Sequence, residues 1–117
     1  MTTWKWKVLR AGTLKLDAGG MFGIIPRVVW ERGVEIDDRH RMKLSHNCLL
    51  LESSESDAKL GDRPRRILIE AGSGDKLGAK MRDIFDLDGR TVETAVTEAG
   101  LSVGQIDHTI VTHLHFD

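Results

Sequence analysis

The chain has 117 residues and a mass of 13.1 kDa, the size of one small domain or of part of one. A hydrophobic share of 40% and a charged share of 30% exclude a disordered chain, and no stretch approaches the ~20 apolar residues of a membrane-spanning helix. The formal net charge of −1 excludes a general attraction to nucleic acid or anionic lipid. Lys5, Lys7 and Arg10 interrupt the N-terminal apolar pattern, so no signal peptide is indicated and a cytoplasmic protein is expected.

The first forty residues predict two strands, a turn and an apolar segment. Apolar and polar residues alternate in 4–8 and again in 13–17, which indicates strands with one buried face. Ala11 and Gly12 between them predict a turn. Residues 21–30 are apolar, but Pro26 lacks a backbone donor, so an ordered loop or an edge segment is expected there. The charged residues 31–43 are expected to cross the surface.

The middle of the chain predicts a buried hairpin. The apolar run 47–52 is typical of a buried strand, and 66–70 returns as its partner. The polar residues 53–66 between them predict a long exposed loop, and the glycine-rich residues 71–75 predict a tight one. Cys48 lies inside the buried run, so a structural thiol is expected there and not a nucleophile.

The last forty residues predict two helices and a final strand. Helical spacing produces two apolar stripes, formed by Leu77, Met81, Ile84 and Phe85 and by Val92, Ala95, Val96 and Ala99. Thr91 is a candidate N-cap, Gly100 is placed to end the second helix, and Ser102 with Gln105 has capping-box spacing. Residues 106–112 predict the final strand. Strands followed by helices and another strand indicate an α/β or α+β fold with a mixed sheet.

Three side chains with metal-ligand chemistry follow that strand. His113, His115 and Asp117 are spaced by two, so an extended segment would point all three to one side, with Leu114 and Phe116 packed on the other. Two imidazoles and a carboxylate are ligands that zinc accepts. The alternative is that two surface histidines and an aspartate simply alternate here. The buried strand immediately before them favours the metal site.

The motifs resemble those of metallo-β-lactamase-fold hydrolases. The residues THLHFD at 112–117 are similar to the start of the signature H-x-H-x-D-H, and Asp107 resembles the approach to it. Residues 69–76 are similar to the D-T-G-x-G-D-K loop, with Glu70 and Ala71 in place of Asp and Thr. Residues 21–30 and 47–50 resemble a bacterial subgroup near the quorum-quenching lactonases and the organophosphate hydrolases.

This resemblance implies an αββα sandwich, of which residues 1–117 form about the N-terminal half of a single domain, with two or three helices. It implies that His113 and His115 bind a first divalent ion and that Asp117, also a catalytic residue, binds a second, zinc being the expected metal. The implied reaction is hydrolysis of a small-molecule ester, lactone or phosphoester by a metal-bound hydroxide. Homo-oligomerisation or association with the remaining half is expected, and no nucleic acid or membrane partner.

The signature's next histidine and the family's later ligands are absent from residues 1–117, so this truncated chain is expected to be inactive alone. The alternative is a non-catalytic binding or assembly module, or one half of a split enzyme. Of the other histidines, His40 and His46 are expected to be solvated, and His108 has no site partner in the pattern.

Overall fold

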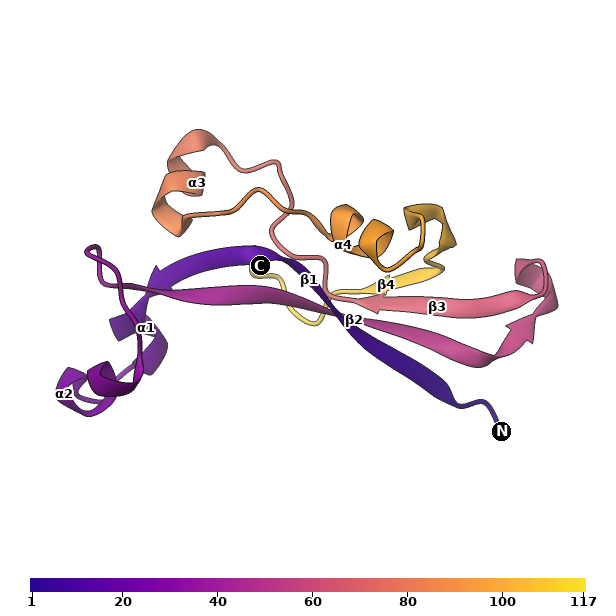
Figure 1. Ribbon diagram of the computed structural model, residues 1–117, viewed down its shortest axis with the longest axis horizontal. Helices are drawn as coiled ribbons and strands as arrows, with labels where there is room; N and C mark the ends of the chain where they lie inside the picture. The colour runs from indigo at the N-terminus through magenta and orange to yellow at the C-terminus, as the bar shows by residue number, and fades with distance from the viewer.

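The computed structural model describes residues 1–117 as a single four-stranded sheet with helices around it (Figure 1). The strands are β1 (Trp4–Asp17), β2 (Arg41–Asp57), β3 (Arg63–Ile69) and β4 (His108–Ile110). The helices are α1 (Ala18–Phe22), α2 (Arg27–Trp30), α3 (Ala79–Phe85) and α4 (Val92–Glu98), with 3-10 turns at Glu31–Gly33, Ala58–Leu60 and Val103–Gln105. The order is β1-β2-β3-β4, antiparallel except for the parallel pair β3–β4. The expected α/β fold with a mixed sheet is confirmed.

Strands β1 and β2 are longer than the sequence pattern predicts. The turn expected at Ala11 and Gly12 is wrong: β1 continues through a bulge, where Gly12 has a φ of 139° and the register shifts. The loop expected over 53–66 is also largely strand. Ser53 Oγ donates to Glu55 O at 2.7 Å and accepts from Arg65 N at 2.9 Å, so one hydroxyl bridges the irregular pairing of β2 with β3.

The apolar residues 21–30 are mostly helical, so the expected loop or edge segment is wrong. The Asp17 carboxylate accepts from Gly20 N at 2.7 Å and starts α1, and the Phe22 and Trp30 rings stack with centroids 4.7 Å apart. The segment from Thr91 to Gln105 follows the prediction. Thr91 caps α4 by accepting from Thr94 N, and Ser102 with Gln105 forms the expected capping box.

The core lies between the sheet and α4, which Figure 1 shows above the strands. Ala95 and Val96 of α4 are buried against residues from three strands. The sheet contributes Leu9, Ala11, Cys48, Leu50 and Leu68. Alternation along each strand places these side chains on the same face, so α4 covers one face of the sheet. Cys48 is buried as expected.

The opposite face of the sheet is apolar and no helix covers it; we call it the open face. The strand register aligns its members across the sheet: Trp6, Val8, Leu49, Leu51, Ile67, Ile69 and Ile110. Trp6 is 71% exposed, Val8 53% and Ile110 48%. The two longer helices, α3 and α4, lie on the other side of the sheet (Figure 1). None of the helices has the length and hydropathy needed to cross a membrane.

An ion pair holds the start of β4 against β3. The Asp107 carboxylate accepts from Arg63 Nη1 at 3.0 Å, from Arg63 Nη2 at 2.6 Å and from Arg66 N at 2.7 Å, and its side chain is only 8% exposed. The hydrogen bonds from Arg63 and Arg66 lower the pKa of Asp107 to about 2. This contact fixes where the chain enters β4, and therefore where residues 111–117 leave the sheet.

The Asp107 contact predicts a pH dependence of stability. A carboxyl group whose pKa is lower in the folded than in the unfolded chain stabilises the fold above the unfolded pKa, near 3.9, and loses that contribution as the pH falls toward the folded pKa. We expect Asp107→Asn to reduce the loss of stability between about pH 4 and pH 2 in urea unfolding. The exposed Asp38→Asn is the control. An Asp107→Asn profile parallel to wild type would contradict this account.

Candidate metal centre

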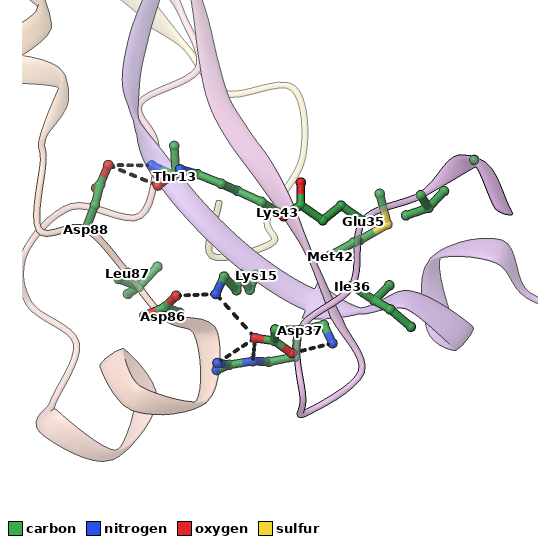
Figure 2. A pocket seen from close by; sticks show the side chains of 13 residues that line it. Thr13, Lys15, Glu35, Ile36, Asp37, Met42, Lys43, Asp86, Leu87 and Asp88 are labelled. Atoms are coloured by element: carbon green, nitrogen blue, oxygen red, sulfur yellow. Dashed lines mark hydrogen bonds and ion pairs between the residues drawn. The ribbon is translucent and has the colours of Figure 1, made fainter. Parts of the chain in front are cut away.

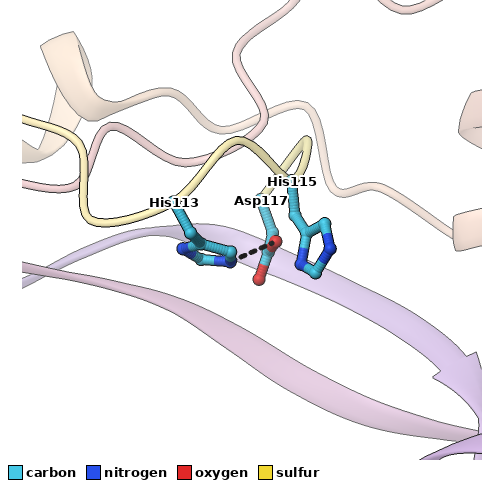
Figure 3. A group of neighbouring side chains, drawn as sticks. All are labelled: His113, His115 and Asp117. Carbon is cyan, nitrogen blue, oxygen red and sulfur yellow. Dashed lines mark ion pairs between the residues drawn. The ribbon is translucent and has the colours of Figure 1, made fainter.

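The segment after β4 brings His113, His115 and Asp117 together. Their candidate ligand atoms lie within 4.8 Å of one another, and all three side chains are exposed. Figure 3 shows the three side chains projecting from the C-terminal segment on the side of the β1–β2 hairpin. The extended geometry expected for them is wrong, because β4 ends at Ile110 and the segment bends instead. In a strand the three side chains would point to one side but stay spaced along it. The bends instead bring their ligand atoms close together.

The two histidine rings meet edge to face. Their centroids are 4.8 Å apart at an interplanar angle of 85°, and His113 Nε2 lies 3.7 Å from Asp117 Oδ1. The two apolar residues that separate the three ligands differ in how they pack. Phe116 packs on Phe85 with centroids 4.5 Å apart, whereas Leu114, expected to be packed, is 97% exposed. The anchor of this segment is therefore Phe116.

Glu70 braces the segment from the end of β3. Its Oε1 accepts from Thr112 N at 2.8 Å and from Thr112 Oγ1, and these bonds hold the pKa of Glu70 below its ordinary value. His113 Nδ1 lies 3.1 Å from Thr112 Oγ1 and 3.9 Å from Glu70 Oε1, which leaves Nε2 toward Asp117. Glu70 has a φ of 69°, so the chain turns directly after β3. From this turn the Glu70 side chain, one methylene longer than the Asp of the similar motif, reaches Thr112.

Removing this brace is expected to weaken metal binding. Outer-shell partners of metal ligands are typically worth about 10–100-fold in affinity. We expect Glu70→Ala to lower zinc affinity by roughly that range, and Glu70→Gln, which keeps an acceptor oxygen, to lose less. Zinc titration against a chelator of known affinity measures both. Glu93→Ala, on the exposed face of α4, is the control. Wild-type affinity in Glu70→Ala would show that the brace is irrelevant to the metal.

The three side chains fit a first-row divalent metal ion. Two imidazole nitrogens and one carboxylate oxygen match the donors that zinc takes at ~2.0–2.2 Å, which places tetrahedral ligands roughly 3.4 Å apart. The present separations of up to 4.8 Å need a closing movement of about 1 Å or slightly more, which exposed side chains make by rotation. His113, His115 and Asp117 would therefore hold divalent metal at this cluster, with coordination positions left for other groups.

A polar cavity of about 190 Å³ adjoins this cluster. Its walls come from β2, from the turn after β3 and from the C-terminal segment, and none of its lining residues is hydrophobic: Ser45, His46, Asn47, Glu70, Gly72, Thr112, His113 and Asp117. His46 is only 5% exposed, so the prediction that it is solvated is wrong. Burial lowers the pKa of His46, opposed by the Asp117 and Asp88 carboxylates.

The alternation along β2 carries a signal for this burial. His46 lies two residues before Cys48, on the same side of the strand as the core residues that follow. The charged residues that precede His46 in the sequence led to the prediction that it is solvated. The other two histidines agree with the sequence analysis: His40 and His108 are exposed and contribute nothing to the cluster.

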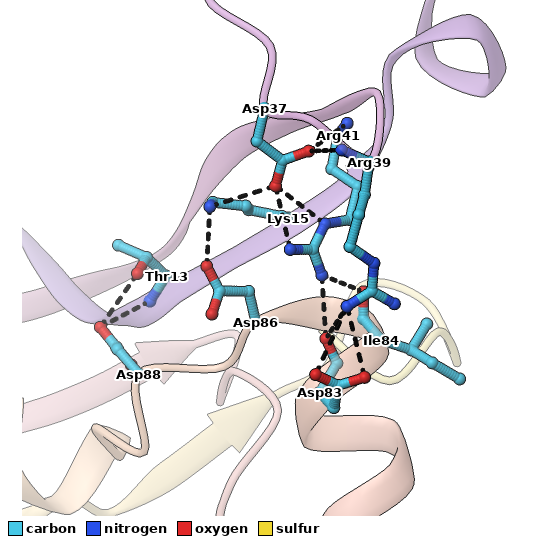
Figure 4. A network of polar contacts seen from close by, with 9 residues as sticks. All are labelled: Thr13, Lys15, Asp37, Arg39, Arg41, Asp83, Ile84, Asp86 and Asp88. Carbon is cyan, nitrogen blue, oxygen red and sulfur yellow. Dashed lines mark hydrogen bonds and ion pairs between the residues drawn. The ribbon is translucent and has the colours of Figure 1, made fainter.

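A larger cavity, of about 690 Å³, lies beside the β1–β2 hairpin (Figure 2). Four of its charged groups form ion pairs with one another. Lys15 Nζ lies 2.8 Å from Asp86 and 3.3 Å from Asp37, and Arg41 pairs with Asp37 at 2.9 Å. Arg41 also donates to the carbonyl groups of Asp83 and Ile84 (Figure 4). This network ties the hairpin to the end of α3, so we assign it a structural role.

Comparison with known proteins identifies one relevant fold. No protein-family model matches the chain, and no curated protein sequence matches it. A solved structure does: the crystal structure of a probable metal-dependent hydrolase from Staphylococcus aureus, with a TM-score of 0.79 and 26% sequence identity. The match covers 97% of this chain and 39% of that protein, so the chain spans well under half of its length. The chain therefore shares its fold with part of a probable metal-dependent hydrolase.

Proposed function

We propose that this chain carries the first ligands of the metal centre of a hydrolase that cleaves an ester, lactone or phosphoester bond. The observation that carries the proposal is the convergence of His113, His115 and Asp117 within 4.8 Å, directly after the β4 strand. The fold shared with a protein described as a probable metal-dependent hydrolase supports it. The substrate class follows from the resemblance of the THLHFD motif to the metallo-β-lactamase-fold signature.

The residues have distinct roles in this proposal. The imidazoles of His113 and His115 bind a first divalent ion, and the Asp117 carboxylate binds a second, zinc being the expected metal. A bound divalent ion acts as a Lewis acid and lowers the pKa of water toward neutrality. Asp117 provides the carboxylate oxygens that can accept a proton at this site. Glu70 and Thr112 orient His113 so that Nε2 faces the shared centre.

We further propose that residues 1–117 form the N-terminal half of one metallo-β-lactamase-like domain. Two observations support this proposal. The open face is uncovered, and a complete sandwich would cover it with a second sheet. The three ligands are exposed, and a complete sandwich would add further ligands to them. The exposed ligand set holds only three donors, fewer than the complete coordination of an ion needs. Residues 1–117 alone are therefore expected to show no metal-dependent hydrolysis.

The proposal is tested by hydrolysis with the protein at its native length. We expect turnover of at least one probe among an aryl ester, a γ-lactone and a phosphotriester, its loss after chelation, and its recovery when zinc is returned. Turnover that survives complete metal removal would contradict the proposal. Metal binding without turnover of any probe would favour the alternative of a non-catalytic module.

A further inference from the structure

His46 is built into the structure in a way that the proposed roles leave unexplained. Its side chain is only 5% exposed, and neither Nδ1 nor Nε2 has a hydrogen-bond partner. Buried polar groups are almost always paired, since an unpaired one loses its hydration without compensation. An imidazole kept in this state next to a candidate metal centre indicates a partner that the residues around it do not supply by themselves.

Two glycines make room for the His46 ring. A Cβ atom at Gly12 would lie 3.5 Å from His46 Nδ1 and only 2.9 Å from Asp88 Oδ1. A Cβ atom at Gly72 would lie 3.5 Å from His46 Cβ and 3.1 Å from Ala11 Cβ. Gly12 and Gly72 both have positive φ, at 139° and 68°, so the bulge in β1 lies against the His46 ring and the turn after β3 lies against its Cβ. Backbone from two other parts of the chain therefore confines the His46 side chain.

Two carboxylates lie near this ring, and only one of them has no hydrogen bond within the chain. Asp88 is already satisfied, because it accepts from Thr13 N, Thr13 Oγ1 and Arg90 N. Asp117 lines the same cavity as His46, and its only polar contact is the 3.7 Å approach of His113 Nε2. An unpaired buried imidazole and a carboxylate without a hydrogen bond thus share one polar cavity.

The other donors in that cavity are less suited to Asp117. Thr112 donates both its N–H and its hydroxyl to Glu70. Ser45 and Asn47 are exposed on β2 and are free to turn toward water. His46 alone combines burial, close packing against two glycines and two unpaired nitrogens.

We propose that His46 is a positioning residue of the metal centre, whose ring N–H donates to the Asp117 carboxylate when Asp117 binds metal. Nδ1 faces Gly12 and Asp88, so the geometry assigns the donor role to Nε2. Ligating carboxylates are generally held by such outer hydrogen bonds, which fix their orientation. This inference rests on the proposed function, since it requires a metal at His113, His115 and Asp117.

The test compares His46→Phe with His46→Gln in the protein at its native length. Phe fills the site without a nitrogen, whereas Gln carries an N–H at a reach close to that of Nε2. We expect His46→Phe to bind zinc roughly 10–100-fold more weakly in a chelator competition, and to alter the visible spectrum of the cobalt(II)-loaded protein. We expect His46→Gln to recover most of the affinity. The thermal midpoint of metal-free His46→Phe should equal or exceed that of wild type, because an unpaired polar group is removed.

His108→Phe, at an exposed position on β4, is the control and should bind zinc like wild type. Wild-type zinc affinity and an unchanged cobalt spectrum in His46→Phe would overturn the inference. If His46→Phe does not fold, His46→Gln decides: near-wild-type affinity supports the role, and a tenfold or greater loss overturns it. Failure of the proposed function itself is recognised separately, because wild type and His115→Ala would then bind zinc equally weakly, which overturns both.

Discussion

Replacing His115 with Ala should remove most of the metal and reduce hydrolysis to background. In the proposed centre His115 contributes one of only two imidazole ligands. Its loss should therefore lower zinc affinity by more than the about 10–100-fold expected for a residue that only positions a ligand. The substitution is a clean test, since the His115 side chain is exposed and its recorded contact is the edge-to-face approach to His113. Folding of the metal-free protein should be unaffected.

Elemental analysis of the purified protein measures the metal, and hydrolysis of the most responsive probe measures the activity. His108→Ala is the matched control, because it removes an exposed histidine from β4 without touching the cluster. Unchanged metal content in His115→Ala would refute the assignment of the ligands, whatever the activity.

The 117-residue chain by itself should associate through its open face. The seven apolar residues of that face leave several hundred Å² of contiguous apolar surface, at the upper range for soluble monomers. At ~25 cal/mol per Å², covering a few hundred Å² is worth several kcal/mol. The loss of translational freedom opposes this gain, but the face is already formed by paired strands, so little further ordering is required.

Sedimentation at micromolar concentration should therefore detect dimers or larger species. Val8→Lys, which places a charge on the open face at a 53% exposed position of the edge strand β1, should shift the chain toward monomer. Val103→Lys is the matched control, because Val103 is 55% exposed but lies on a 3-10 turn away from the face. A folded 13.1 kDa wild-type monomer that binds no hydrophobic dye would contradict this prediction.

The fold class was predictable because periodicity is a local property. The apolar stripe of α4, the Thr91 cap and the buried strand around Cys48 appear where their spacing placed them. The stripe predicted for α3 is only partly correct, because Leu77 precedes the helix and Met81 is exposed. The errors have non-local causes. Gly12 reads as a turn in isolation, but pairing with β2 converts it into a bulge, and the Ser53 hydroxyl extends β2 across residues expected to form a loop.

The candidate metal centre was predictable in its residues and not in its geometry. The spacing of His113, His115 and Asp117 identified the group, but bends and not an extended strand bring the side chains together. The burial of His46 depends on Gly12 and Gly72 from two other parts of the chain, which a local pattern cannot reveal. The brace from Glu70 to Thr112 is also a contact between distant residues.

The most direct test of the central claim is anomalous X-ray scattering from crystals of the zinc-loaded protein at its native length. Data collected on both sides of the zinc edge locate the ion independently of any activity. We expect a zinc peak at ~2.0–2.2 Å from the imidazole nitrogens of His113 and His115, and a second zinc peak at that distance from the Asp117 carboxylate. A zinc peak held by other residues, or no peak at this cluster in a zinc-loaded crystal, would contradict this assignment.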